Sequence, residues 1–136
     1  QPTIIRCKTP TYESMVKEIF GPIVSIYVYP DDKLEETLAV CDSASPYALT
    51  GAIFAQDREA IVKMEKALRN ASGNFYINDK CTGAIVGQQP FGGARASGTN
   101  DKAGTTLNMI RWVSAHTVKE AFCPSPAIVY PYMSEK

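Results

Sequence analysis

The sequence has no surplus of charge of either sign. Its 136 residues include 14 lysines and arginines and 14 aspartates and glutamates, so the formal net charge is zero. A protein that holds nucleic acid by its phosphate groups needs an excess of basic residues. The balance therefore argues against a nucleic-acid partner.

The sequence also lacks a long hydrophobic run. Its longest run of β-branched and aromatic residues, 23–29, is far shorter than the roughly 18 residues that a membrane-spanning helix requires. We therefore predict no membrane partner. No signal-peptide pattern opens the sequence, and the first residue is Gln1 rather than methionine. We expect a piece of a longer protein, whose targeting signal would lie upstream.

Metal-ligating side chains are few and scattered. There is one histidine, and the four cysteines are Cys7, Cys41, Cys81 and Cys123. Zinc sites normally bring their ligands in closely spaced pairs, and no such pair is present. We predict no metal site. We also expect free thiols in a reducing compartment rather than disulfides.

What the sequence does contain is an alternation of strand and helix patterns. With 45% hydrophobic and 21% charged residues, it has the composition of a globular domain. Strands are predicted within residues 2–7, 23–29, 47–55 and 74–78, because these segments are short and rich in β-branched or aromatic residues. Strand–helix–strand order with short connections predicts parallel pairing and an α/β fold.

The two intervening helices have recognisable ends. Asp32 stands three residues before Glu35, the pattern of a capping box, and Asp57 is a good N-cap for the second helix. Gly73 is placed to close that helix. Two pairs of side chains, Glu59–Lys63 and Glu65–Arg69, have the spacing of ion pairs on its solvent side.

From residue 79 to residue 104 the periodicity disappears, and a long irregular loop is usually functional or disordered. The glycines at 92, 93 and 98 lack the spacing of a dinucleotide-binding fingerprint and the lysine of a phosphate-binding loop, so they indicate tight turns. Earlier, Glu18-Ile-Phe-Gly-Pro22 joins a carboxylate to an aromatic ring. It could contact a ribose and a flat ring, or simply end a helix.

The last part of the sequence is predicted to extend away from the domain. Residues 105–110 suit a short helix, and residues 111–122 alternate weakly, as in a strand. Residues 123–136 contain three prolines, which excludes a central strand. We expect an extended arm that lies on another surface, such as that of a second subunit; a frayed terminus is the alternative.

Four segments occur in a characteristic order: Glu18–Pro22, Tyr47–Phe54, Gly73–Asn78 and Pro90–Gly98. Together they resemble the C-terminal third of the aldehyde dehydrogenase superfamily, over residues 1 to about 120. The resemblance implies an α/β fold, with a parallel sheet and flanking helices forming part of the catalytic domain in residues 1–110. Residues 111–136 would be an oligomerisation strand and an extended arm, so a homo-oligomer is expected.

Residues 78–102 are most similar to the branch of this family that oxidises L-glutamate γ-semialdehyde with NAD in proline breakdown. The resemblance implies a mitochondrial-matrix enzyme in animals. The sequence departs from that pattern after Lys102. Two alternatives remain: an aldehyde dehydrogenase of different specificity, and a non-catalytic, truncated interaction module.

The resemblance also implies roles for particular residues. Glu18 would bind the ribose hydroxyls of NAD, and Phe20 would position its nicotinamide. The backbone N–H groups of Gly83 and Ala84 would bind the carboxylate of the semialdehyde, because successive amides suit an anion. Phe91 would pack against the aliphatic part of the substrate.

The catalytic residues are expected upstream of this chain. The family's nucleophilic cysteine, oxyanion-hole asparagine and general-base glutamate match no position here, so no catalytic residue is assigned. The resemblance places the family's substrate-anchor loop, here called the anchor loop, before Pro90 and around Gly83 and Ala84. Cys81 lies near this loop but lacks the nucleophile's motif, and Arg95 is expected to form a structural ion pair. We therefore expect the isolated chain to have no dehydrogenase activity, which NADH production by this chain alone would contradict.

Overall fold

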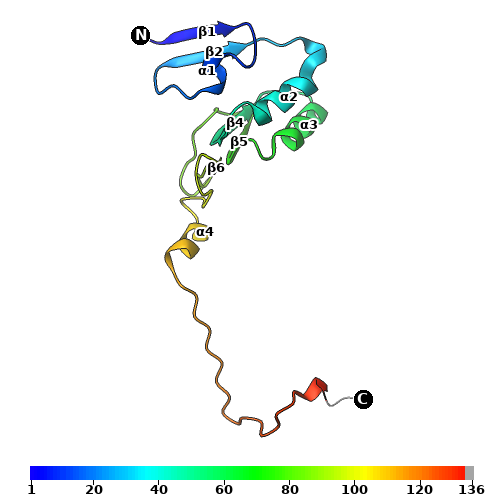
Figure 1. Cartoon of the computed structure of the whole chain (residues 1–136), viewed down its shortest axis with the longest axis vertical. Helices are drawn as coiled ribbons and strands as arrows, with labels where there is room; N and C mark the ends of the chain where they lie inside the picture. The colour runs from blue at the N-terminus through cyan, green and yellow to red at the C-terminus, as the bar shows by residue number, and fades with distance from the viewer. Residues whose placement is uncertain (134–136) are drawn as a thin grey trace.

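The computed structural model describes residues 1–133. Strands and short helices alternate through the first three quarters of the chain, and an irregular arm follows (Figure 1). The elements, in order, are β1 Thr3–Cys7, α1 Glu13–Val16, β2 Ile23–Tyr27, the 3₁₀ turn η1 Asp31–Lys33, α2 Leu34–Ser43, β3 Tyr47–Ala48, β4 Thr50–Ile53, α3 Arg58–Leu68, β5 Asn74–Ile77, β6 Ala94–Arg95, α4 Thr106–Met109, η2 Ile110–Trp112 and η3 Pro131–Met133.

Strands β1 and β2 form a parallel pair, in register from Thr3 opposite Ile23 to Cys7 opposite Tyr27. The connection between them contains α1, which a hydrogen bond of 2.7 Å between the Ser14 and Ser25 hydroxyls ties to β2. This pair lies at the opposite end of the molecule from the arm (Figure 1).

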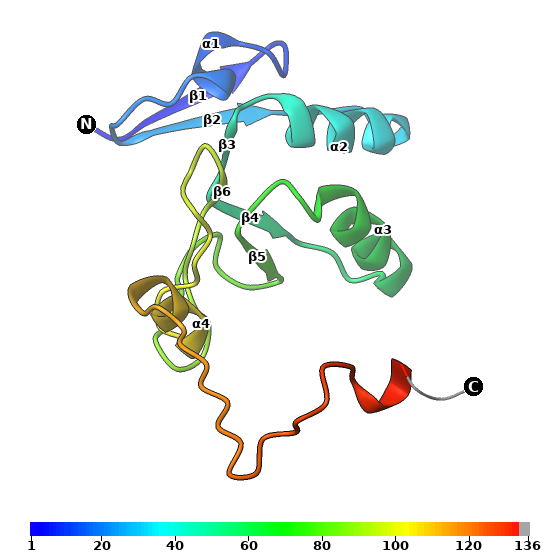
Figure 2. The same cartoon turned by 60° about the horizontal axis from the view of Figure 1, so that its bottom comes forward.

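The core lies where α2 and α3 pack against the second parallel pair, β4 and β5. Leu38, Ile53, Ile61 and Leu68 are buried there, and Phe75 packs against them. As predicted, Asp57 caps α3, accepting hydrogen bonds from the Glu59 and Ala60 backbone N–H groups. Helices α2 and α3 lie side by side in both ribbon views (Figures 1 and 2).

The four strands predicted before residue 79 are present, and their predicted pairing is confirmed only in part. β4 and β5 are parallel, but β2 pairs with β1 and not with β4, and every sheet in residues 1–133 has two strands. The predicted strand 47–55 is interrupted at Leu49, whose carbonyl accepts hydrogen bonds from Gly73 and Asn74. Before this break β3 pairs antiparallel with β6; after it β4 pairs with β5. Local hydrophobicity cannot specify such a change of partner.

Two predicted helix ends are wrong. Asp32 lies in η1, Lys33 takes the N-cap position of α2, and no side chain caps that helix. The Lys33 N–H bonds to the Pro30 carbonyl, so a 3₁₀ turn occupies the place of the capping box. Helix α3 ends at Leu68, and Gly73 lies just before β5 instead of closing the helix. A β-carbon on Gly73 would collide with the Gly92 carbonyl.

The arm departs from the prediction in one respect. The short helix at 105–110 is confirmed by α4, but residues 111–122 form no strand, because within residues 1–133 nothing hydrogen-bonds to them as a neighbouring strand. From Val113 the backbone runs away from the body and turns back near its end (Figures 1 and 2). Residues 134–136 of the predicted tail lie outside the described residues.

Candidate functional site

The loop between β5 and α4 is held by backbone pairing at several points. Phe91 and Ala103 form an antiparallel bridge, with N–H···O distances of 3.0 and 2.8 Å. Between them, β6 pairs with β3 at Ala94 and Ala48. These contacts fix the backbone of the irregular segment at Phe91, Ala94 and Ala103.

A buried amide side chain anchors the backbone on either side of Phe91. Asn74, at the start of β5, is only 3% exposed. Its Nδ2 donates to the Pro90 carbonyl at 2.8 Å, and its Oδ1 accepts from the Gly92 N–H at 3.0 Å. The Lys102 ammonium donates to the Gly73 and Gly92 carbonyls. The backbone on both sides of Phe91 is thereby fixed.

The glycine cluster forms the tight turn that the sequence predicts. A β-carbon on Gly93 would lie 2.6 Å from the β-carbon of Ser97, too close for any other residue. The Ser97 hydroxyl accepts from the Ala48 N–H at 2.9 Å, which joins the turn to β3. Arg95 forms the predicted structural ion pair, with Asp42 at 2.6 Å.

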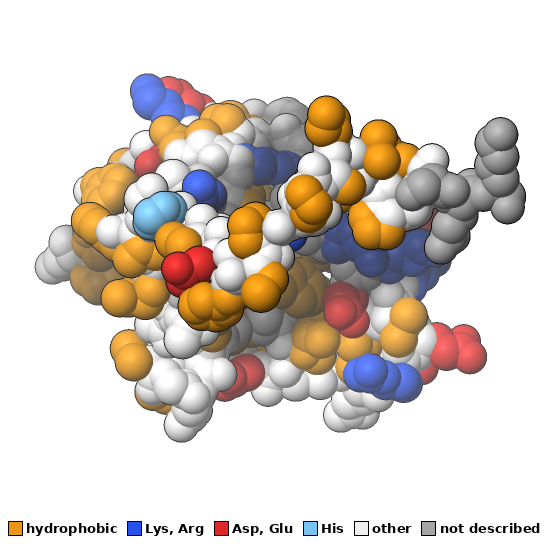
Figure 3. Space-filling model, turned by 90° about the horizontal axis from the view of Figure 1, so that it is seen from below, with side chains coloured by type: hydrophobic (Ala, Val, Ile, Leu, Met, Phe, Trp, Pro, Cys, Tyr) orange, Lys and Arg blue, Asp and Glu red, His pale blue; other side chains and the backbone are white. Residues whose placement is uncertain are grey.

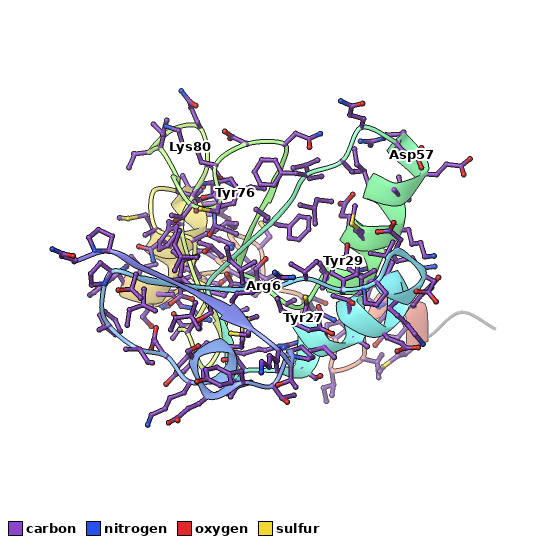
Figure 4. All side chains as sticks on the ribbon, turned by 90° about the horizontal axis from the view of Figure 1, so that it is seen from above. Arg6, Tyr27, Tyr29, Asp57, Tyr76 and Lys80 are labelled. Carbon is purple, nitrogen blue, oxygen red and sulfur yellow. The ribbon has the colours of Figure 1, made fainter. Side chains whose placement is uncertain are left out.

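A cavity of about 370 Å³ opens beside the end of β5, and Figure 4 shows Tyr76 and Lys80 on this side of the molecule. The Gly83 N–H donates to the Tyr76 hydroxyl at 3.2 Å, and Gly83 has a φ of +151°, a value that favours glycine. The cavity is lined by Phe75, Tyr76, Ile77, Asp79, Gly83, Ile85, Gln88 and Gln89.

The candidate site residues are divided between regions of the structure. Gly83 lines the cavity; Ala84 is outside its lining, although the Ala84 N–H has no hydrogen-bond partner in residues 1–133. Phe91 sits in its bridge with Ala103, 37% exposed, and does not line the cavity. Glu18 and Phe20 lie between α1 and β2, also outside its lining, and Phe20 is 93% exposed.

The four cysteines all lie in the described residues, and none of them is in a disulfide. All four are free thiols, and Cys7 is buried. Partial burial raises the pKa of the Cys41 thiol, which keeps it protonated at neutral pH. Within residues 1–133 no group of three or more His, Cys, Asp or Glu side chains is placed to hold a metal ion. Nor is any helix there long and apolar enough to cross a membrane.

Ionic contacts hold the far end of the loop. Asp101 accepts a hydrogen bond from the Thr99 hydroxyl at 2.6 Å and one from the Arg111 Nε at 2.7 Å. These bonds, with the Thr99 contribution the larger, hold the pKa of the Asp101 carboxyl below its usual value. Asp101 therefore stays ionised and links the loop to η2.

The sequence profile of the aldehyde dehydrogenase family matches residues 1–118. The chain belongs to the aldehyde dehydrogenase family. Among curated relatives, it is 65% identical over 133 residues to the mitochondrial delta-1-pyrroline-5-carboxylate dehydrogenase of Dictyostelium discoideum, and 56% identical over 133 residues to that of Homo sapiens. Each alignment covers 98% of this chain and 24% of the relative, so the chain spans about a quarter of their length.

A solved aldehyde dehydrogenase structure has the same fold over this segment. The crystal structure of delta-pyrroline-5-carboxylate dehydrogenase from Mycobacterium tuberculosis bound with NAD superposes with a TM-score of 0.79 at 51% identity. The superposition covers 98% of this chain and 24% of that one. The segment therefore has the aldehyde dehydrogenase fold, with parallel strand pairs and flanking helices.

Sequence reasoning missed two residues of this aldehyde dehydrogenase segment. Asn74 was assigned only to a strand, although asparagine is depleted in strands and its place at the first strand residue was a usable signal. The sequence pattern places Tyr76 only in a strand, and no local pattern indicates that its hydroxyl meets Gly83, seven residues later.

Proposed function

We propose that the protein containing this chain is an NAD-dependent aldehyde dehydrogenase that oxidises L-glutamate γ-semialdehyde, formed from delta-1-pyrroline-5-carboxylate, to glutamate in proline catabolism. The observation that supports this proposal most strongly is the identity of the chain to two relatives named delta-1-pyrroline-5-carboxylate dehydrogenase. They are 65% and 56% identical to it over 98% of its length. Because both are named as mitochondrial, we extend the proposal to a mitochondrial enzyme, in the matrix.

Glu18 and Phe20 have the properties that a nicotinamide cofactor needs. The Glu18 carboxylate makes no hydrogen bond or ion pair in residues 1–133, so its oxygens are free to accept from ribose hydroxyls. The exposed Phe20 ring offers a flat apolar face. When bound, NAD supplies the hydride acceptor, and this chain's residues supply binding and orientation. The M. tuberculosis structure with bound NAD supports this part of the proposal.

The anchor loop would bind the carboxylate of the substrate, at the end of the molecule away from the aldehyde. Among the described residues, the Ala84 N–H has no hydrogen-bond partner and the Gly83 N–H donates only to a neutral hydroxyl. Amide hydrogen bonds to an ionised acceptor are stronger than those to a neutral one. The Asn74 side chain fixes the backbone on both sides of Phe91, and the Phe91 ring would pack against the methylene groups of the substrate. Upstream residues would supply the thiolate that attacks the aldehyde and the base that activates water to hydrolyse the thioester.

Substrate discrimination in the full-length protein tests this assignment. With NAD present, kcat/KM for L-glutamate γ-semialdehyde should exceed that for pentanal by about 100-fold. Each of two hydrogen bonds from a backbone N–H to the carboxylate is worth about 1.5 kcal/mol or more. Ala84→Pro removes one N–H and should reduce kcat/KM for the semialdehyde about tenfold, leaving that for pentanal unchanged.

The matched control is Ala84→Gly, which keeps the N–H and should retain the discrimination. Equal kcat/KM values of the unmodified enzyme for the two aldehydes would reject glutamate semialdehyde and favour another aldehyde dehydrogenase specificity. A full-length protein without the upstream nucleophile would instead favour the interaction-module alternative.

We also propose that residues 1–110 belong to the catalytic domain, and that residues 111–136 are an oligomerisation strand and arm. Residues 111–122, which form no strand within residues 1–133, would become one on pairing with a second subunit. The exposed apolar side chains of the arm support this division. Among them, Val118 is 76% exposed and Phe122 is 91% exposed. Figure 3, which views the molecule from the arm's side, shows hydrophobic side chains along it. A homo-oligomer would cover them.

A further inference from the structure

The Tyr76 side chain brings a hydroxyl group to the cavity beside the anchor loop. Tyr76 lies in β5 and is only 5% exposed, so burial restricts the movement of its ring. Tyr76 and Gly83 both line the cavity, and the Tyr76 hydroxyl oxygen accepts a hydrogen bond from the Gly83 N–H at 3.2 Å. This bond joins a rigid strand to the irregular loop.

A tyrosine hydroxyl that accepts a hydrogen bond still has its own hydrogen to donate. Within residues 1–133 that hydrogen has no acceptor: the bond with Gly83 is the one hydrogen bond of the Tyr76 oxygen, and there the oxygen is the acceptor. Buried tyrosine hydroxyls usually find a partner. The structure therefore places an unused donor at the cavity.

The charges around the cavity do not attract an anion by themselves. Asp79 lines it and repels a carboxylate. Lys80 offsets this charge, because its side chain packs beside Gly83: a β-carbon on Gly83 would lie 3.6 Å from the Lys80 Cδ. With one charge of each sign nearby, recognition of a carboxylate depends on directed hydrogen-bond donors.

We propose that the Tyr76 hydroxyl is a specificity-determining donor, which binds the substrate carboxylate together with the Gly83 N–H. This proposal rests on the proposed function and adds a side-chain donor to it. A carboxylate presents two acceptor oxygens side by side. Since Tyr76 Oη and Gly83 N are 3.2 Å apart, one carboxylate spans both. Before substrate binds, the bond between them keeps the loop in place.

The test is Tyr76→Phe in the full-length enzyme, because this change removes the hydroxyl and keeps the buried ring. The KM for L-glutamate γ-semialdehyde should rise about tenfold, the usual loss for one hydrogen bond to a charged group, with kcat little changed. The KM for pentanal should not move. Tyr12→Phe is the matched control, since the exposed Tyr12 hydroxyl has no hydrogen bond in residues 1–133.

A binding measurement separates recognition from catalysis. L-Glutamate, which carries the same carboxylate, should raise the Tm of the unmodified enzyme and of Tyr12→Phe, and should raise that of Tyr76→Phe less. An unchanged or lower KM for the semialdehyde in Tyr76→Phe would overturn the proposal, as would a KM that rises equally for both aldehydes. Failure of the unmodified enzyme to prefer the semialdehyde would instead reject the proposed function.

Discussion

Asn74 illustrates how one residue fixes a loop that has no regular structure of its own. The Asn74 amide group donates a hydrogen bond to the Pro90 carbonyl and accepts one from the Gly92 N–H. These two bonds attach the segment around Phe91 to β5. Side-chain amides are suited to this arrangement because they carry a donor and an acceptor on one rigid plane. The position of Phe91 is therefore set at a residue 17 positions away in the sequence.

Asn74→Ala should lower the free energy of unfolding of the full-length protein by about 2 kcal/mol, because it leaves the partly buried Gly92 N–H and Pro90 carbonyl without the Asn74 side chain as their partner. Chemical denaturation measures the change. Asn70→Ala is the control, since Asn70 is exposed and has no hydrogen bond in residues 1–133. Equal stability of the two variants would show that the Asn74 contacts do not hold the loop.

From residue patterns alone, a role could be predicted only where it depends on near neighbours, as in the turn at Gly93, which the local glycine content indicates. The Arg95 ion pair joins residues 53 positions apart, and only the family resemblance predicted it. The Asn74 and Tyr76 contacts were not predicted, because each joins a strand to a loop whose path depends on the whole fold. The roles assigned to Glu18, Phe20, Gly83, Ala84 and Phe91 stay predictions.

At the scale of elements, helix α3 combines a predicted start with an unpredicted ion pair. Lys63 pairs with Glu35 of α2 instead of Glu59 of its own helix. The hydrogen bond from Lys63, aided by its charge, holds the pKa of the Glu35 carboxyl below its usual value. Spacing along one helix could not show this pair, because the partner comes from another helix.

The N-cap of α3 gives a matched comparison with the capping box that was predicted for α2. Asp57→Ala should lower the free energy of unfolding of the full-length protein by about 1 kcal/mol, because two backbone N–H groups lose their acceptor. Asp32→Ala should leave it unchanged, since Asp32 caps no helix in the structure. Denaturation of both variants would decide; a loss for Asp32→Ala as large as that for Asp57→Ala would favour the sequence-based assignment.

At the scale of the whole molecule, the strands and helices were largely predictable, but their assembly was not. Hydrophobic patterns located β2, β4, β5, α2 and α3, because each pattern is local. The change of partner at Leu49 and the two-stranded sheets depend on contacts between distant segments. The conformation of the arm was the least predictable from the sequence, because within residues 1–133 no strand pairs with it.

The arm leads to the last prediction, which concerns assembly. Val118→Asp combined with Phe122→Asp should reduce the molecular mass of the full-length protein in solution, because two charged groups would enter the proposed interface between subunits. Lys119→Glu combined with Glu120→Lys is the control: it exchanges two exposed charges in the same segment and keeps the apolar side chains. Light scattering coupled to gel filtration measures the mass of each variant. If the double aspartate variant assembles like the unmodified protein, the arm is not the oligomerisation element, and its apolar side chains need another explanation.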